Sequence, residues 1–196
     1  MHRKFIAFII GSAMTVTSLA ASPVEARDRG EAAAIIAGVA ALAIVGAAIA
    51  DNKNVSAYLV DTFPYPYRRE DAEVWISTGC KEKPGKNFAI DLDGLCIGGI
   101  GVEVQEGWRR FTGEIGYWLG EEYWGKGLAT QAVTEMTKWS FSDLEIHKLM
   151  APVLEPNRRS MRVLEKCGYE LEGILRDEVY KEGTFYNLYH YSRISS

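Results

Sequence analysis

The chain has 196 residues, and its 22 basic and 26 acidic side chains are interspersed, which gives a formal net charge of −4 at pH 7. Because no stretch concentrates basic residues, the sequence argues against a groove that binds nucleic-acid phosphates. The three cysteines, Cys80, Cys96 and Cys167, have neither metal-ligand spacing nor a disulfide framework, a pattern typical of a reducing compartment. The three histidines lie far apart, so no metal site is predicted.

The first part of the chain differs from the rest in composition. Residues 1–26 combine a basic start, an apolar run over 5–21 and small residues around a cleavage-like site, which predicts a signal or anchor segment. Residues 27–54 are alanine-rich and carry no charge over 32–50, about the length that crosses a bilayer. This second stretch is predicted either to span a membrane or to form an amphipathic or buried helix.

Residues 55–196 have the pattern of one α/β domain. A turn-like stretch, FPYPY, is followed by a helix pattern over 68–81. Hydrophobic periodicity and turn signals then predict strands over 87–91, 95–104 and 110–119, a helix over 127–142, a strand over 148–154, a second helix that opens at 156–157 and closes at Gly168, and a hairpin of strands 169–179 and 184–194. This order predicts a mixed sheet flanked by helices.

A glycine-rich turn lies between the third of these strands and the following helix. It reads EEYWGKGLATQAV over 121–133, with Gly125 and Gly127 on either side of Lys126. The first amides of a helix lack intrahelical partners, and glycines let a phosphate approach them closely. The turn also fits most of the nucleotide-triphosphate loop motif, but Gly127 occupies the position where that motif needs a hydroxyl for Mg²⁺. The pattern therefore favours a pyrophosphate cradle over 124–130.

Two runs within and after the third strand resemble the acetyl-CoA motif of the GNAT acetyltransferases: EIGYWL over 114–119 and YWGKGLATQAV over 123–133. Further along, the Pro-Asn pair at 156–157, Ser160 and VLEKCGY over 163–169 are similar to the branch typified by the ribosomal-protein N-acetyltransferases RimJ and RimL. The FPYPY stretch also resembles a substrate-side segment of that branch.

The resemblance covers about residues 55–194. It implies an α/β fold of the GNAT type, with a mixed, mostly antiparallel sheet flanked by helices and preceded by the apolar N-terminal extension. The expected activity is direct transfer of an acetyl group from acetyl-CoA, the co-substrate, to a primary amine on a small molecule or peptide. A degenerate acyl-CoA-binding or membrane-anchored module without turnover is the alternative.

The resemblance also implies which residues contact the cofactor. Asn157 either caps its helix or hydrogen-bonds the cofactor, and Lys126 either pairs with a phosphate or is solvated. Backbone amides are expected to bind the pantetheine arm at Tyr117, Trp118 and Leu119, and the pyrophosphate at Trp124, Gly125, Lys126, Gly127, Leu128, Ala129 and Thr130.

Acetyl transfer requires a base, because free amines are protonated at neutral pH. Glu114 is the candidate, since strand alternation places it on one face with Gly116, which leaves open space beside the carboxylate. An ion pair with a neighbouring strand is the alternative for Glu114. The resemblance makes Ser160 a candidate proton donor to the departing thiolate, and a surface hydroxyl is the alternative. Tyr65 and Tyr67 either line the acceptor pocket or pack on its rim.

The family normally begins with a strand and a helix, of which only residues 51–58 match the end of that helix. Without the first strand, the strand over 87–91 is expected to form an exposed edge that favours pairing with another chain, as in a homodimer. Because acetyl-CoA is cytosolic, the domain is expected in the cytoplasm, anchored if 5–21 and 32–50 both insert and exported if only the first does.

Overall fold

A computed structural model of the chain describes residues 8–10, 14–18, 52–59, 87–92 and 95–195. The chain divides into two compact units, one formed by Met1–Ile100 with Trp118–Trp124 and the other by Gly101–Tyr117 with Gly125–Ser196. Strands β4 (Leu95–Val104) and β5 (Thr112–Leu119) each contribute one end to each unit. We call these units unit 1 and unit 2.

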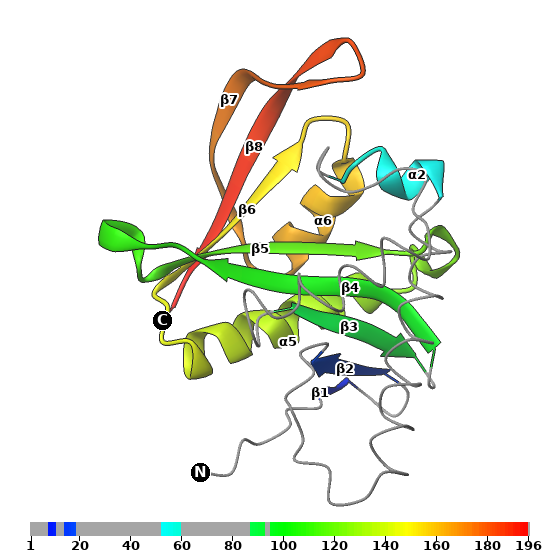
Figure 1. Cartoon of the computed structure of the whole chain (residues 1–196), viewed down its shortest axis with the longest axis vertical. Coiled ribbons are helices and arrows are strands. Elements are labelled where there is room, and N and C mark those ends of the chain that lie inside the picture. The colour runs from blue at the N-terminus through cyan, green and yellow to red at the C-terminus, as the bar shows by residue number, and fades with distance from the viewer. Residues whose placement is uncertain (1–7, 11–13, 19–51, 60–86, 93–94, 196) are drawn as a thin grey trace, which may run out of the picture. The chain divides into compact units, whose positions relative to one another are not determined.

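Unit 1 contains three antiparallel neighbours, β1 (Phe8–Ile10), β2 (Met14–Ser18) and β3 (Asn87–Leu92) (Figure 1). The prediction that the strand over 87–91 has an exposed edge is wrong, because β2 pairs along β3 from Met14↔Leu92 to Ser18↔Phe88. Nonlocal pairing of this kind leaves no mark in the local sequence pattern. The apolar run over 5–21 was predicted as part of a signal or anchor segment. Its described residues form the paired strands β1 and β2.

Several predictions for the first 86 residues lie outside the described part of the chain. They include the rest of the signal segment, the alanine-rich stretch over 32–50, the helix over 68–81, and Tyr65 and Tyr67. Among the residues that the structure does describe, no helix combines the length and the apolar character needed to cross a membrane.

Within unit 1, hydrogen bonds from two asparagine side chains connect the short helix α2 (Lys53–Ser56) to Glu121. Asn52 caps this helix through its own side chain, and the Nδ2 groups of Asn52 and Asn54 each donate to the Glu121 carboxylate at 2.9 Å. Nearby in unit 1, β4 and β5 approach so closely that a Cβ at Gly98 would collide with the Trp118 carbonyl. A glycine at this position therefore lets the two strands pair.

In unit 2 the strands run in the order β5-β6-β8-β7, where β6 is Lys148–Leu154, β7 is Glu170–Lys181 and β8 is Thr184–Ile194. The β5–β6 pair is parallel, whereas β6–β8 and β7–β8 are antiparallel. A parallel neighbour needs a crossover connection, which α5 (Leu128–Asp143) provides. The predicted mixed, mostly antiparallel sheet flanked by helices is confirmed.

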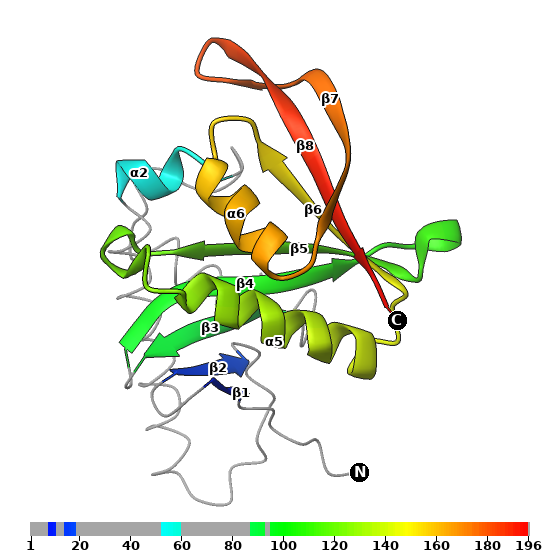
Figure 2. The same cartoon turned by 180° about the vertical axis from the view of Figure 1, so that it is seen from behind.

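Helices α5 and α6 (Arg158–Lys166) cover one face of the unit 2 sheet (Figure 2). Their bounds lie within two residues of the predicted ones, and the chain leaves α6 through Gly168 at φ 77°, the left-handed conformation expected there. The apolar stripe of each helix is buried, with Ala132, Val133, Met136 and Trp139 on α5 and Met161 and Leu164 on α6.

Candidate functional site

The glycine turn has the geometry of an open anion cradle. Gly125 and Gly127 have φ of 75° and 81°, in the left-handed region that a β-branched residue avoids. A Cβ built on either glycine would meet nothing within 4 Å, so open space lies beside the backbone. Both glycines therefore give the turn its conformation and keep that space clear.

The start of α5 adds unpaired donors to this turn. Gly127 is the N-cap residue and has no side-chain cap, and the first turn contains no acidic residue. The Gln131 amide makes the first helical bond, to the Gly127 carbonyl at 3.1 Å. The amides between them are those that a helix start leaves without intrahelical acceptors, and the helix dipole adds positive potential there. The residues fit a diphosphate.

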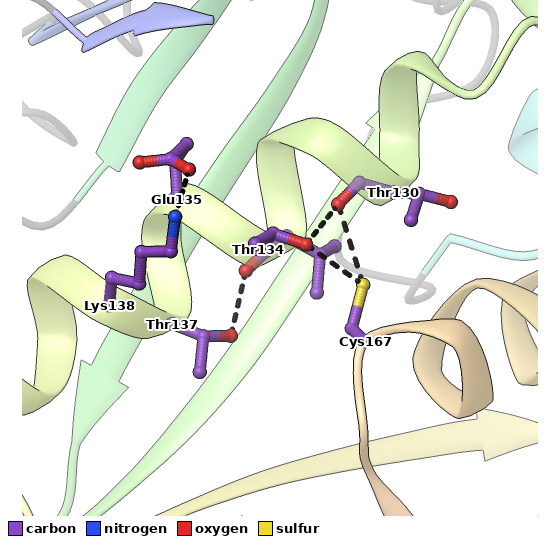
Figure 3. A network of polar contacts seen from close by, with 7 residues as sticks. Thr130, Thr134, Glu135, Thr137, Lys138 and Cys167 are labelled. Carbon is purple, nitrogen blue, oxygen red and sulfur yellow. Dashed lines mark hydrogen bonds and ion pairs between the residues drawn. The ribbon is translucent and has the colours of Figure 1, made fainter.

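The first turn of α5 is fixed against the end of α6 by a small polar network (Figure 3). The Thr130 carbonyl accepts from Thr134 Oγ1 at 2.8 Å and from Cys167 Sγ at 3.4 Å. Burial raises the pKa of the Cys167 thiol, which keeps it protonated and able to donate. A buried, protonated thiol suits packing between the two helices and is a poor nucleophile.

Asn157, Ser160 and Tyr117 form a second cluster, where β5 faces α6. The Asn157 side chain caps α6 by accepting from the Ser160 amide at 3.2 Å. The Tyr117 hydroxyl lies 2.8 Å from Ser160 Oγ and donates to the Ser160 carbonyl at 3.3 Å. Burial of this hydroxyl raises the pKa of Tyr117 well above its usual value.

The family resemblance implied only a backbone role for Tyr117, so its side-chain contact with Ser160 was missed. The available signal was strand alternation, which places Tyr117 on the same face as the buried Ile115. That face is the one covered by helices.

Glu114 lies on the opposite, exposed face of β5, with Gly116. No ion pair or side-chain hydrogen bond of Glu114 is found in the part of the chain that the structure describes, and a Cβ at Gly116 would meet nothing within 4 Å. The β5–β6 ladder ends at Glu114↔Met150, although both strands continue and diverge in Figure 1. The carboxylate thus stands where the two strands part, beside open space.

The other predicted residues divide between the units. Lys126 is exposed in unit 2, whereas Trp118, Leu119 and Trp124 belong to unit 1. There Trp124 Nε1 donates to the Leu119 carbonyl at 2.8 Å and fixes the loop to the end of β5. No group of three potential metal ligands occurs among the described residues.

Replacing Asn157 with alanine removes the cap of α6 and is expected to lower the free energy of unfolding by about 1 kcal/mol. Urea unfolding measures this loss, and Asn157→Asp, which keeps an acceptor oxygen, should retain most of the stability. An alanine variant as stable as the original chain would show that the bond to the Ser160 amide contributes nothing.

These features define an α/β domain with an open glycine turn before an uncapped helix start. The sequence model of the acetyltransferase (GNAT) domain matches residues 39–170. The chain therefore belongs to the GNAT acetyltransferase family. The match begins inside the stretch predicted to be an alanine-rich helix, upstream of the domain start predicted at residue 55.

A curated relative is the spermidine N(1)-acetyltransferase of Escherichia coli K12, 31% identical over 103 residues that cover 52% of this chain and 54% of that protein. The chain spans about half the length of the curated relatives it matches.

Two solved structures share the fold. The ribosomal-protein-S5-alanine acetyltransferase of Vibrio fischeri has a TM-score of 0.70 at 18% identity and covers 96% of both chains. The spermidine N-acetyltransferase of Vibrio cholerae, in complex with CoA and spermine, has a TM-score of 0.66 at 20% identity, with 92% of this chain and 95% of that chain covered.

Proposed function

We propose that this chain is an N-acetyltransferase that binds acetyl-CoA and a primary amine together and transfers the acetyl group directly between them. The observation that supports this most strongly is the glycine-opened start of α5, with left-handed Gly125 and Gly127, open space beside both and no side-chain cap. Membership of the GNAT family supports the diphosphate of acetyl-CoA as the ligand of this cradle.

Bound acetyl-CoA supplies an activated acyl group and a thiolate leaving group. The amides over 125–130 hold the diphosphate by hydrogen bonds to charged oxygens, which are about twice as strong as neutral ones. The network of Thr130, Thr134 and Cys167 keeps the first turn of α5 rigid for this task. The roles of Trp118, Leu119 and Trp124 in binding stay predictions from the family motif.

Glu114 acts as the general base. Its exposed carboxylate, beside Gly116 and the point where β5 and β6 separate, is accessible to an incoming ammonium group. The carboxylate attracts the cationic amine and takes its proton, directly or through one water molecule, which frees the lone pair for attack. Holding both reactants in one site removes the need for a covalent enzyme intermediate.

Ser160 acts as the proton donor to the departing sulfur. Its amide is held by Asn157 and its hydroxyl by Tyr117, so the side chain has a defined position at the start of α6. The ammonium group loses one proton to Glu114 before the attack, and the nitrogen loses a second proton to solvent as the amide forms. The Ser160 proton goes to the sulfur, and the proton on Glu114 returns to Ser160 through solvent. The net products are an amide, free CoA thiol and one proton released to solvent, and the enzyme is unchanged.

The acceptor is proposed to be a primary amine of a small molecule or a peptide. The relatives with this fold are named for spermidine and for the alanine of a ribosomal protein, which are amines of both kinds. Tyr65 and Tyr67 stay predicted acceptor contacts, because they lie outside the described residues. We propose the cytoplasm as the compartment, because acetyl-CoA is cytosolic. The homodimer expected from an exposed strand edge has lost that ground, because β2 pairs along β3.

Calorimetric titration with acetyl-CoA, followed by a thiol-release assay with a panel of amines, tests this function. We expect saturable binding and release of CoA thiol that depends on the added amine. Binding without thiol release from any amine would instead indicate an acyl-CoA-binding module without turnover, and absence of binding would reject both functions.

A further inference from the structure

The phenol of Tyr117 is shared between two atoms of one residue. It lies 2.8 Å from Ser160 Oγ, the usual length of a strong O–H···O bond, and 3.3 Å from the carbonyl oxygen of the same serine. The reaction proposed above uses this phenol only to hold the serine side chain in place and does not say which of the two hydroxyls donates. At this distance, the Tyr117 phenol can determine where the hydrogen of the Ser160 hydroxyl points.

Each hydroxyl has a single hydrogen, so the direction of the bond decides what Ser160 can do. If Ser160 donates to Tyr117, its hydrogen is already used. If Tyr117 donates to Ser160 Oγ, the serine hydrogen is free to point elsewhere. When Tyr117 is the donor, its single hydrogen points to Ser160 Oγ at 2.8 Å, and the Ser160 carbonyl at 3.3 Å is a weaker second acceptor of that hydrogen.

A second tyrosine in unit 2 also lies on a hydroxyl side chain, and there a further hydrogen bond fixes the direction. The Tyr169 hydroxyl lies 2.8 Å from Thr137 Oγ1, and Thr137 donates its own hydrogen to the Val133 carbonyl at 2.7 Å. Tyr169 must therefore be the donor in that pair. Burial raises the pKa of Tyr169 to about 12, so its phenol, like that of Tyr117, stays protonated at neutral pH.

We propose that Tyr117 is a positioning residue that donates to Ser160 Oγ and so leaves the serine hydrogen free for the departing thiolate. This inference rests on the proposed acetyltransferase function. Asn157 fixes the backbone of Ser160, and Tyr117 fixes its side chain. Tyr117 keeps its own proton throughout, and the proton that moves to sulfur is that of Ser160.

Binding of CoA and of desulfo-CoA, which lacks the sulfur, tests this without turnover. Both ligands are titrated into the full chain at about pH 7 and about pH 9, because a free thiol ionises near 8.5. The ratio of CoA affinity to desulfo-CoA affinity should increase with pH, because at the higher pH the CoA sulfur is a thiolate that accepts the serine hydrogen. Tyr117→Phe should reduce this affinity ratio roughly 10-fold at the higher pH, because about that much is lost with one hydrogen bond to a charged group. The affinity for desulfo-CoA should stay the same.

Activity provides the second readout. Tyr117→Phe should lower kcat roughly 10-fold with little change in KM for acetyl-CoA, and it should have no further effect in a Ser160→Ala chain. Tyr169→Phe is the matched control, because it removes an equivalent buried phenol and should change neither kcat nor the preference for CoA.

Three outcomes would overturn the inference in distinguishable ways. An unchanged CoA preference and kcat in Tyr117→Phe, with a reduced kcat in Ser160→Ala, would reject the role of Tyr117 alone. Equal losses caused by Tyr117→Phe with and without Ser160 would show that Tyr117 does not act through Ser160. Absence of binding of either ligand to the original chain would reject the acetyltransferase function, and the inference with it.

Discussion

Replacing Gly127 with valine should reduce acetyl-CoA affinity by roughly 100-fold or more, which corresponds to the loss of about two hydrogen bonds to a charged group. Two effects act together. The φ of 81° at this position is unfavourable for a β-branched residue, so the turn must change its conformation. The added methyl groups would also fill the open space beside the first amides of α5. Titration calorimetry measures the loss.

Gly183 offers a matched control for this substitution. It has φ of 83° in the turn between β7 and β8, and a Cβ there would also meet nothing within 4 Å. Gly183→Val should therefore impose the same backbone strain without changing acetyl-CoA affinity. If Gly127→Val bound acetyl-CoA as well as the original chain, the cradle would not be where the diphosphate binds.

The second large effect is expected at Glu114. Glu114→Gln keeps the shape of the side chain but removes the base, so kcat/KM should fall by roughly 100-fold to 1,000-fold near neutral pH. Affinity for acetyl-CoA should stay unchanged, because the carboxylate stands on the exposed face of β5, away from the cradle helix. Steady-state kinetics with an amine identified by the thiol-release assay measures both quantities.

The pH dependence distinguishes a base from a binding group. In Glu114→Gln the rate should follow the fraction of free amine, which rises about tenfold per pH unit below the pKa of the amine, so the deficit shrinks at high pH. Glu170→Gln removes another exposed strand carboxylate in unit 2 and should leave the rate unchanged. A Glu114→Gln chain with full activity at every pH would remove Glu114 from the mechanism.

Much of unit 2 could be predicted because its elements are marked locally. The apolar stripes of α5 and α6, the turn around Lys181–Gly183 and the left-handed Gly168 each follow from a short window of sequence. The same holds for the open start of α5, since glycines between a strand and an amphipathic helix signal an exposed helix start. Element bounds differ from the predicted ones by only one or two residues in most cases.

The features that sequence analysis missed depend on long-range contacts. The strands β1 and β2 lie in an apolar run that also fits a signal segment, and only pairing with β3 shows that they are strands. Tyr117 and Ser160 are 43 residues apart, and their contact depends on which helix covers that face of β5. The end of the β5–β6 ladder at Glu114 likewise depends on the pairing of two strands that lie far apart in the sequence.

The central claim is that backbone amides at the start of α5 hold the diphosphate of acetyl-CoA. A crystal structure of the chain with CoA tests it most directly. We expect the diphosphate oxygens within hydrogen-bond distance, about 2.7–3.2 Å, of the amides over 125–130. A diphosphate bound elsewhere, or a cradle filled by one of the chain's own side chains while CoA is bound, would contradict the account.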